Sequence, residues 1–365
     1  MTDIVVIGAG YAGLAAAKLA ARWTGARVTL VNERDRFVER VRLHQLAAGQ
    51  TLRDLPLVEL LAGTGVELVV DRVTAIDPAA RKVVLRGGAL SYDRLIYALG
   101  SHADLGSVPG VREHAHTVTT LEEAERLRVA LGRARVVAVA GGGLTGIEAA
   151  AELAEARPDL EVHLVTAGTL GAALSPAGRA HLRKVFGRLG VVVHEDVRIT
   201  AVDAHGLVVG AGRVDADTVV WTAGFAVPEL ARAAGFEVDG RGRMVVDDTL
   251  TSVSHPEVVA VGDAAAMRRP DGQELRMACA TGLPTTQRAV RALADRLRGR
   301  TPKPFRFSYI NQCVSLGRRD GLIQFVRPDD SPRDRVLTGR WAARYKEAVV
   351  RFTITFERHP TLPAG

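Results

Sequence analysis

The stretch that most constrains the fold is residues 4–33. Residues 4–7 form a short apolar run of the kind found in buried parallel strands. The run breaks at the motif GAGYAG, residues 8–13, and an alanine-rich segment with helical character follows it. A second apolar run, residues 28–31, then ends at Asn32 and Glu33. This order predicts a strand, a tight turn, a helix and a second, parallel strand.

Each glycine of the motif has a mechanical role in such a turn. Gly8 allows the chain to turn tightly, Gly10 lets a pyrophosphate approach the backbone, and Gly13 lets the helix pack against the strand. The free N–H groups and the positive end of the helix then hold phosphates. Glu33 follows the last glycine by about 20 residues, where a carboxylate can accept from ribose hydroxyls. The motif alone would be weak, but the whole order indicates a dinucleotide-binding unit.

The same unit returns in the middle of the chain. A strand is predicted over residues 135–140, the motif GGGLTG occupies residues 141–146, and a helix and a second strand are predicted over 147–156 and 162–165. An internal repeat of this kind predicts an α/β chain with two nucleotide sites. The alternative is that the second turn merely packs a helix. Ala167 takes the place of Glu33 and no arginine marks a 2′-phosphate, so NADH and NADPH both stay open.

Three further strands end in small residues. Residues 92–99 end at Gly100, residues 218–222 end at Ala223 and Gly224, and residues 258–261 end at Gly262 and Asp263. Turns of this kind bring the backbone close to a nucleotide. Asp263 could accept from a polyol chain, or it could simply cap the helix that follows. A basic helix is predicted to begin at residues 281–287, with Pro284 in its first turn.

The remaining patterns predict smaller elements. Residues 66–76 and 81–85 alternate like strands, joined by a turn at residues 77–78. Residues 305–316 and 321–326 predict a hairpin. Residues 337–352 predict a basic amphipathic helix, which could either cap that hairpin or lie on a membrane surface.

Composition excludes several classes of protein. The 365 residues suit two or three domains, and no apolar run reaches the ~20 residues that a bilayer requires. The first strand begins near residue 3 with no signal segment before it, which favours the cytoplasm. Cys279 and Cys313 cannot form a C-x-x-C pair, and we expect buried thiols. His114 and His116 lack a third ligand nearby, so no metal site is expected. The net charge of +7 comes from scattered arginines, which argues against nucleic-acid binding.

Three features follow one another in a fixed order: the first glycine motif with Glu33, the second glycine motif, and Gly262-Asp263. This set resembles the two-dinucleotide-binding-domain flavoproteins of the pyridine nucleotide–disulfide oxidoreductase superfamily, over roughly residues 3–300. No C-x-x-C lies near residues 38–46, so the chain is most similar to the type II NADH dehydrogenase-like branch, which lacks the redox disulfide. The resemblance implies two Rossmann-like domains, the second inserted in the first, and a small C-terminal α+β region. The domains would be residues 1–108 with 242–300 for FAD, 109–241 for NAD(P)H, and 301–365.

The resemblance also implies which residues bind the cofactors. FAD would be bound by Gly8, Gly10, Tyr11, Ala12, Gly13, Glu33, Arg34, Arg42, Val73, Ala98, Gly100, Gly262, Asp263, Pro284 and Thr285. NAD(P)H would be bound by Gly141, Gly143, Leu144, Thr145, Gly146, Glu148, Ala223 and Gly224. No side chain is expected to act as catalytic acid or nucleophile, because hydride passes from nicotinamide to flavin N5. Glu148 and Gln287 are candidate supporting residues.

The electron acceptor is the least determined part. Type II dehydrogenases carry an alanine-glutamine pair, three residues and a further glutamine beside the quinone, and here only Gln287 of that pattern is present. We expect a quinone or another small aromatic acceptor, against the apolar residues Phe37, Val38, Leu43 and Leu46. Two alternatives stay open: a reductase of a protein acceptor such as ferredoxin, which the positive charge would suit, and a flavin-bearing binding protein that senses nucleotides. A homodimer and membrane contact through residues 337–352 also stay open.

Overall fold

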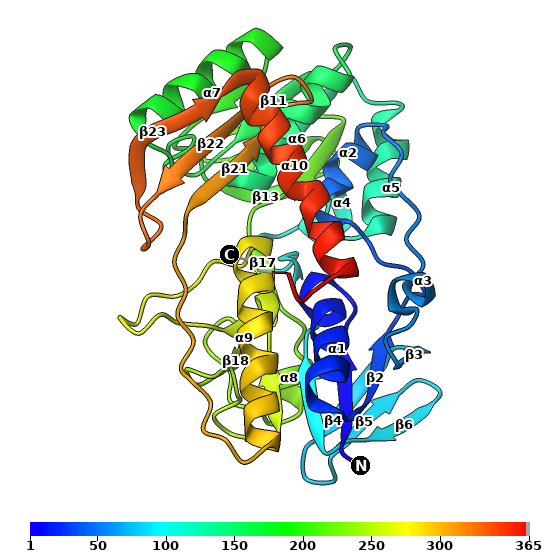
Figure 1. Cartoon of the computed structure of the whole chain (residues 1–365). Coiled ribbons are helices and arrows are strands. Elements are labelled where there is room, and N and C mark those ends of the chain that lie inside the picture. Colours follow the sequence, from blue (N-terminus) through cyan, green and yellow to red (C-terminus); the bar gives the residue numbers. More distant parts are fainter. Residues whose placement is uncertain (363–365) are drawn as a thin grey trace.

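The computed structural model describes residues 1–362 and contains two five-stranded parallel sheets, each built around one glycine turn (Figure 1). The strand orders are β19-β7-β1-β2-β3 and β12-β11-β10-β16-β9. The first sheet lies in the lower half of Figure 1 and the second in the upper half. The predicted α/β fold with two Rossmann-like units is therefore confirmed.

The first sheet is discontinuous in sequence. Its strands are β1 (Asp3–Ile7), β2 (Arg27–Asn32), β3 (Val66–Val70), β7 (Arg94–Tyr97) and β19 (Val258–Ala260). Helix α1 (Tyr11–Thr24) follows the glycine turn and packs beside α9 (Cys279–Leu297) (Figure 1). Strand β19 pairs with β7 after the chain has completed the second unit. Residues far apart in sequence therefore meet at the carboxyl edge of this sheet.

The second sheet repeats the arrangement. Its strands are β10 (Val136–Ala140), β11 (Glu161–Val165), β12 (Val192–His194), β16 (Thr218–Trp221) and β9 (Ala115–His116). The helices around it are α5 (Leu121–Leu131), α6 (Leu144–Ala156) and α7 (Pro176–Leu189). The two units touch where β8 (His102–Ala103) pairs antiparallel with β17 (Phe225–Ala226).

Two antiparallel meanders flank the sheets. They are β4 (Val73–Asp77), β5 (Lys82–Leu85) and β6 (Gly88–Ser91), and β13 (Ile199–Asp203), β14 (Gly206–Val209) and β15 (Gly212–Asp215). The prediction of one strand over residues 66–76 was wrong, because the chain leaves the sheet at Asp71. The Asp71 carboxylate accepts the backbone N–H of Arg72 at 2.6 Å and that of Gly87 at 2.9 Å, which stabilises the turn.

The C-terminal region holds three strands and one long helix. The strands are β21 (Asn311–Ser315), β22 (Gly321–Val326) and β23 (Pro332–Thr338), and the helix is α10 (Gly339–Arg358). The predicted hairpin is correct at its turn, but its first strand starts at residue 311 and β23 was missed. Exposed charged residues at positions 333–335 hide the strand pattern of β23. Gly339, with φ +71°, lets the chain pass directly from β23 into α10.

Helix α9 also begins earlier than predicted. Its first residue is Cys279, so Pro284 lies in the second turn instead of the first. A proline there removes one backbone bond, and threonine hydroxyls near it donate to backbone carbonyls of the helix or of the residues just before it. Thr281 Oγ donates to Arg276 O at 2.7 Å, and Thr285 Oγ donates to Thr281 O at 2.6 Å.

The remaining elements are short. They are the 3₁₀ turns Arg40–Arg42 and Gly262–Ala264, the helices α2 (Leu43–Ala47), α3 (Leu57–Leu61), α4 (Val111–His114) and α8 (Leu230–Ala233), and the strands β18 (Met244–Val245) and β20 (Ala265–Ala266). Helix α2 packs against α5 and α6 in the core of the second unit. Leu43 and Leu46 are buried there, so the expectation that they contact an acceptor was wrong.

Candidate functional site

The first glycine turn has two crowded glycines and one open glycine. Gly8 has φ +94°, and a Cβ on Gly13 would lie 1.8 Å from the Gly8 carbonyl oxygen. Both positions are therefore closed to any side chain by the chain's own backbone. A Cβ on Gly10 would meet nothing within 4 Å. The absence of a side chain at Gly10 leaves room for a group from outside the chain, which is the fit that a pyrophosphate needs.

The second glycine turn has the same construction. Gly141 has φ +115°, and a Cβ on Gly146 would lie 1.9 Å from the Gly141 carbonyl oxygen. A Cβ on Gly143 would meet nothing within 4 Å. The structure thus contains two glycine turns, here called the two cradles, whose outer glycines are required by packing and whose middle glycine is open.

The ends of the second strands differ between the units. In the first unit Asn32 Oδ1 accepts the backbone N–H of Ala9 at 2.9 Å, and Glu33 is exposed, 3.9 Å from Arg72. The second unit has Ala167 at that place. A carboxylate nevertheless lies close by, because Glu195 after β12 accepts the N–H of Leu170 at 2.6 Å. The sequence analysis missed Glu195, since only the pairing of β12 with β11 brings it beside this loop.

Asp263 lies at a junction of three segments. Its Oδ2 accepts from Ser101 Oγ at 2.6 Å and lies 3.9 Å from Arg40 Nη1. Arg40 also donates to the Ser101 carbonyl oxygen at 2.6 Å. Burial lowers the pKa of Arg40, while Asp263 opposes that shift. A Cβ on Gly262 would meet the side chain of Ala12, so this junction adjoins the first cradle.

Three of the predicted residues bind elsewhere in the chain. Arg42 forms two hydrogen bonds to Glu347 of α10, at 3.1 and 2.8 Å. Arg34 pairs with Glu122 at the start of α5 and so links the two units. Gln287 Nε2 donates to the carbonyl oxygens of Pro360 and Leu362, at 2.7 and 2.6 Å. These side chains connect segments of the fold, and their predicted cofactor roles stay predictions.

The other predicted residues surround the two cradles. Tyr11 packs edge-on against Phe37 at 5.0 Å between ring centres, and its buried hydroxyl has no partner within residues 1–362. Gly224, with φ of +97°, directly precedes β17, and Gly100, with φ of +64°, lies two residues before β8. The rest lie at or just beyond strand ends or in the first two turns of helices: Ala12, Val73, Ala98, Leu144, Thr145, Ala223, Pro284 and Thr285.

A charged pair links α6 to α10. Glu148 Oε1 lies 3.1 Å from Lys346 Nζ and accepts the Ser315 N–H at 2.9 Å, while Lys346 donates to the Cys313 carbonyl oxygen at 3.2 Å. Burial alone would raise the pKa of Glu148, but Lys346, His44 and the Ser315 N–H hold it below its ordinary value. Burial opposes the charge on Lys346 as well, yet Glu148 keeps its pKa raised. Both groups are therefore charged.

Neutral groups surround this pair. Burial lowers the pKa of His44 to about 4, and its Nε2 has no partner in the described part of the chain. Burial raises the pKa of the half-buried Cys313 to about 11. The Cys313 thiol therefore stays protonated near neutrality, which does not suit a nucleophile. The expectation of a buried thiol was wrong for Cys279, which is exposed at the start of α9.

Comparison with known proteins agrees with this geometry. The family model for pyridine nucleotide-disulphide oxidoreductases matches residues 2–292. The chain belongs to this family. It is 35% identical to an NADH dehydrogenase-like protein of Mycobacterium tuberculosis over 78% of each chain. It is 27% identical to a type II NADH:quinone oxidoreductase of Staphylococcus haemolyticus over 95% of this chain and 93% of that protein.

A solved structure shows the same fold. The sulfide:quinone oxidoreductase of Aquifex aeolicus superposes with a TM-score of 0.83 over 98% of this chain and 92% of that chain, at 22% identity. Family membership confirms the predicted superfamily and the predicted cofactors. The chain is an FAD-dependent oxidoreductase, and a nicotinamide nucleotide is its co-substrate.

Proposed function

We propose that the chain oxidises NADH or NADPH and passes the electrons by way of FAD to a quinone. The observation that carries this proposal is the presence of two cradles with open middle glycines, joined through the β8–β17 contact. The alignment with a type II NADH:quinone oxidoreductase over nearly the whole length of both proteins supports the acceptor class.

The residues that would hold FAD belong to the first cradle and to the Asp263 junction. Backbone N–H groups at Gly10 and Tyr11 would take the pyrophosphate, and Glu33 and Asp263 would accept from hydroxyl groups. We propose Arg40 as the basic residue of this site in place of Arg42, because Arg40 is the one that reaches Asp263. When bound, the two cofactors supply the hydride chemistry, so the chain contributes alignment and charge.

Lys346 is our candidate for the acceptor end of the site. The start of α9 adjoins the Asp263 junction, since a Cβ on Gly282 would lie 3.9 Å from Gly262 Cα. Lys346 lies near this helix start, where its charge acts on the Cys279 thiol. A quinone gains negative charge on its oxygens as it is reduced, and a fixed ammonium stabilises such charge. We propose that Lys346 presents a proton at Nζ to the acceptor and that Glu148 keeps it there.

Helix α10 supports a peripheral contact with a membrane. It exposes Trp341, Tyr345, Val349 and Phe352, whose spacing of four, four and three residues forms one stripe, while another face packs on β22. Arg344 stacks over the Trp341 ring at 4.9 Å. An aromatic stripe flanked by arginines suits a surface of anionic lipids. The predicted alternatives of cap and anchor are therefore compatible, because they use different faces of one helix.

No helix among residues 1–362 is long and apolar enough to cross a membrane.

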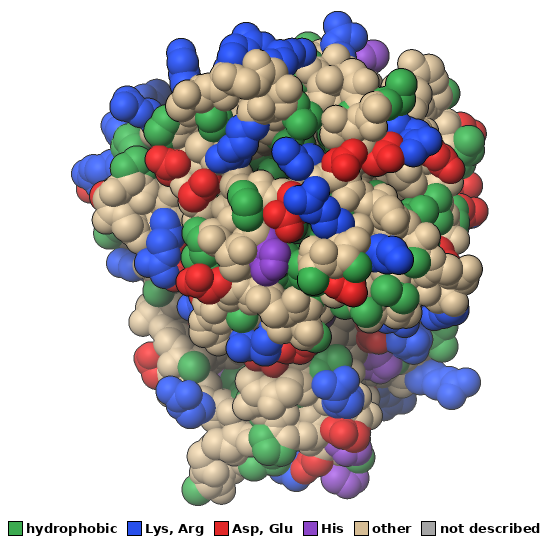
Figure 2. Space-filling view, turned by 90° about the horizontal axis from the view of Figure 1, so that it is seen from below, with side chains coloured by type: hydrophobic (Ala, Val, Ile, Leu, Met, Phe, Trp, Pro, Cys, Tyr) green, Lys and Arg blue, Asp and Glu red, His purple; other side chains and the backbone are tan. Residues whose placement is uncertain are grey.

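The net positive charge supports a protein acceptor less well than the alignment supports a quinone. Figure 2 shows basic side chains interspersed with acidic ones on the face that it draws. A docking site for an acidic protein would need basic groups gathered in one patch. We therefore keep the quinone as the proposed acceptor.

Anaerobic titration of the purified protein tests the proposal. The protein should be yellow and should bleach on addition of NADH or NADPH, and a quinone should restore the colour. Lys346→Gln should slow reoxidation by the quinone and leave bleaching unchanged, whereas Lys303→Gln, at an exposed position, should change neither. A colourless protein that FAD cannot reconstitute would contradict the proposal. Bleaching without reoxidation by any quinone would contradict the acceptor alone.

A further inference from the structure

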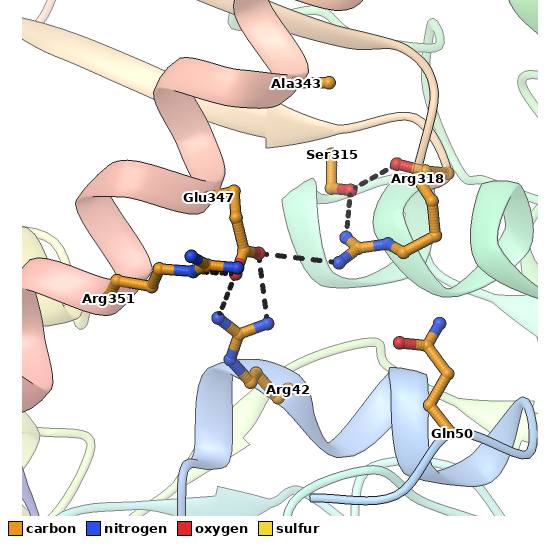
Figure 3. A pocket seen from close by; sticks show the side chains of 8 residues that line it. Arg42, Gln50, Ser315, Arg318, Ala343, Glu347 and Arg351 are labelled. Atoms are coloured by element: carbon orange, nitrogen blue, oxygen red, sulfur yellow. Dashed lines mark hydrogen bonds and ion pairs between the residues drawn. The ribbon is translucent and has the colours of Figure 1, made fainter.

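A cavity of about 340 Å³ opens between three segments that lie far apart in the sequence (Figure 3). One wall belongs to residues 42–50, one to the β21–β22 turn and one to α10. Its polar lining consists of Arg42, Gln50, Ser315, Arg318, Glu347 and Arg351. Neither glycine turn contributes to this lining, so the cavity is distinct from both nucleotide cradles.

Three guanidinium groups converge on one carboxylate in this cavity (Figure 3). Glu347 accepts from Arg42 at 3.1 and 2.8 Å and from Arg351 at 2.8 Å, and Arg318 Nη1 lies 3.6 Å away. Burial alone would raise the pKa of Glu347, but Arg42 and Arg351 hold it below its ordinary value. An ionised carboxylate therefore occupies the place to which all three arginines point.

The three arginines differ in how far their donors are used. Arg42 uses four of its five N–H donors within the chain, because it also donates to Glu39 at 3.2 Å and to Gln45 at 3.1 Å. Arg351 uses only Nε in the contacts of residues 1–362, and its side chain is 66% exposed. Its two terminal nitrogens are therefore available to a ligand.

Arg318 offers a second set of donors, and Ser315 holds it in place, because the Ser315 hydroxyl donates to the Gly317 carbonyl oxygen at 2.9 Å. Arg318 Nη2 donates to Ser315 Oγ at 3.1 Å, and Arg318 Nε lies 3.3 Å from Glu152, which stands behind the cavity wall. Burial raises the pKa of Glu152. Arg318 and Arg351 thus approach the cavity from different segments with N–H groups beyond those that Glu347 needs.

We propose that this cavity binds a phosphate group. A phosphate presents several oxygens around one centre, and guanidinium forks match that geometry closely. Arg318 and Arg351 would donate to it, and Glu347 would act as an internal competitor. The volume is at the lower end of the range for small-ligand sites, which suits a phosphate carrying a small organic group. The inference does not depend on the proposed quinone acceptor.

The phosphate could come from two sources that share this chemistry. Arg351 belongs to α10, the helix that also exposes the stripe from Trp341 to Phe352, so the headgroup of an anionic phospholipid is one source. A soluble organic phosphate is the other. If neither binds, the arginines serve only to fasten α10 to the second unit.

The test uses the full-length flavoprotein and two probes. Calorimetric titration with glycerol phosphate, at constant ionic strength, measures the soluble ligand. Flotation with phosphatidylcholine vesicles, with and without phosphatidylglycerol, measures the lipid. Arg318→Gln and Arg351→Gln should each weaken binding of the effective probe by about tenfold or more, since each removes a hydrogen bond between charged groups. Arg340→Gln, on the same helix but outside the cavity, should have little effect.

A second variant keeps the test decisive if an arginine variant folds poorly. Glu347→Gln removes the internal competitor and should tighten binding of the same probe, whereas a purely structural cluster predicts no such gain. Preferential binding of phosphatidylglycerol vesicles identifies the lipid, and binding of glycerol phosphate alone identifies a soluble ligand. Binding of neither probe overturns the proposal, as does an equal loss in Arg340→Gln and Arg351→Gln. Flavin content and the melting temperature establish that each variant is folded.

Discussion

The two nucleotide units have the same glycine turns but hold the C-terminal helix by opposite chemistry. In the first unit Lys18 of α1 donates to the carbonyl oxygens of Glu357 and Arg358, at 2.7 and 2.9 Å, at the end of α10. In the second unit Glu148 of α6 accepts from Lys346 within α10. Backbone sterics inside each turn allow one solution, so the turns agree. The contacts that each unit makes with α10 are not restricted by backbone sterics, and these contacts differ between the units.

Substituting alanine for the crowded glycines should have the largest effect, a loss of folding stability. Gly13→Ala and Gly146→Ala would each place a Cβ less than 2 Å from a carbonyl oxygen of the preceding turn. We expect each to lower the free energy of unfolding by about 3 kcal/mol or more. Chemical unfolding curves measure this loss. A normal midpoint for either variant would show that the turn can relax and that the two units are not sterically equivalent.

Substituting valine for the two open glycines should show which ligand each unit binds. Gly10→Val should abolish FAD retention, whereas Gly143→Val should retain FAD and weaken NAD(P)H binding roughly hundredfold, because the phosphate loses charge-assisted hydrogen bonds. Flavin absorbance and the NADH concentration for half-maximal bleaching are the measurements. Loss of flavin from Gly143→Val would reverse the assignment of the two cradles.

Acid should weaken the attachment of α10 to the second unit. The pKa of Glu148 is below its ordinary 4.5 in the folded chain, so its stabilisation is full above that pH and is lost as the pH falls through the folded pKa. Glu148→Gln should cost about 2 kcal/mol at neutral pH, because it leaves Lys346 unpaired. It should also flatten the pH dependence of the melting temperature below pH 4.5. Glu161→Gln, at an exposed site, is the control, and equal acid sensitivity in both variants would contradict this reasoning.

Replacing the carboxylates at the strand ends, Glu33 and Asp263, should have a smaller effect on FAD binding. Glu33→Ala should raise the dissociation constant of FAD about tenfold through loss of a hydrogen bond to a charged group. Asp263→Ala should weaken FAD similarly, since its carboxylate is the other acceptor at this site. Fluorescence titration of the apoprotein with FAD measures both. Unchanged FAD affinity in both variants would show that neither carboxylate contributes and that the backbone of the first cradle alone binds FAD.

The smallest expected effect is a change in nucleotide preference. Ala167→Glu would give the second unit the acid that the first unit has. It should favour NADH over NADPH by about tenfold or less, because the carboxylate repels a 2′-phosphate. The ratio of the two bleaching titrations measures the preference. An unchanged ratio would indicate that Glu195, already beside this loop, performs that selection.

Much of the site could be predicted because it is local. The glycine motifs, the strands before them and the helices after them follow from residues within about 30 positions of one another, where backbone sterics permit few alternatives. The contact of Arg40 with Asp263 could not be predicted, because the sequence does not tell which way the 3₁₀ turn directs Arg40 and Arg42. The pairing of Lys346 with Glu148 could not be predicted either, because α10 meets α6 only in the folded chain.

The sequence by itself determined that two phosphate cradles exist, and therefore the family and its cofactors. It could do so because the crowding at Gly13 comes from Gly8, which is near in sequence: a Cβ on Gly13 would lie 1.8 Å from the Gly8 carbonyl oxygen. Only the tertiary structure decided which distant charges face each other: Arg40 with Asp263, Glu148 with Lys346, and Arg42 and Arg318 with Glu347. Such pairs join segments that are distant in sequence, and their geometry is fixed by packing between the two units and the C-terminal helix.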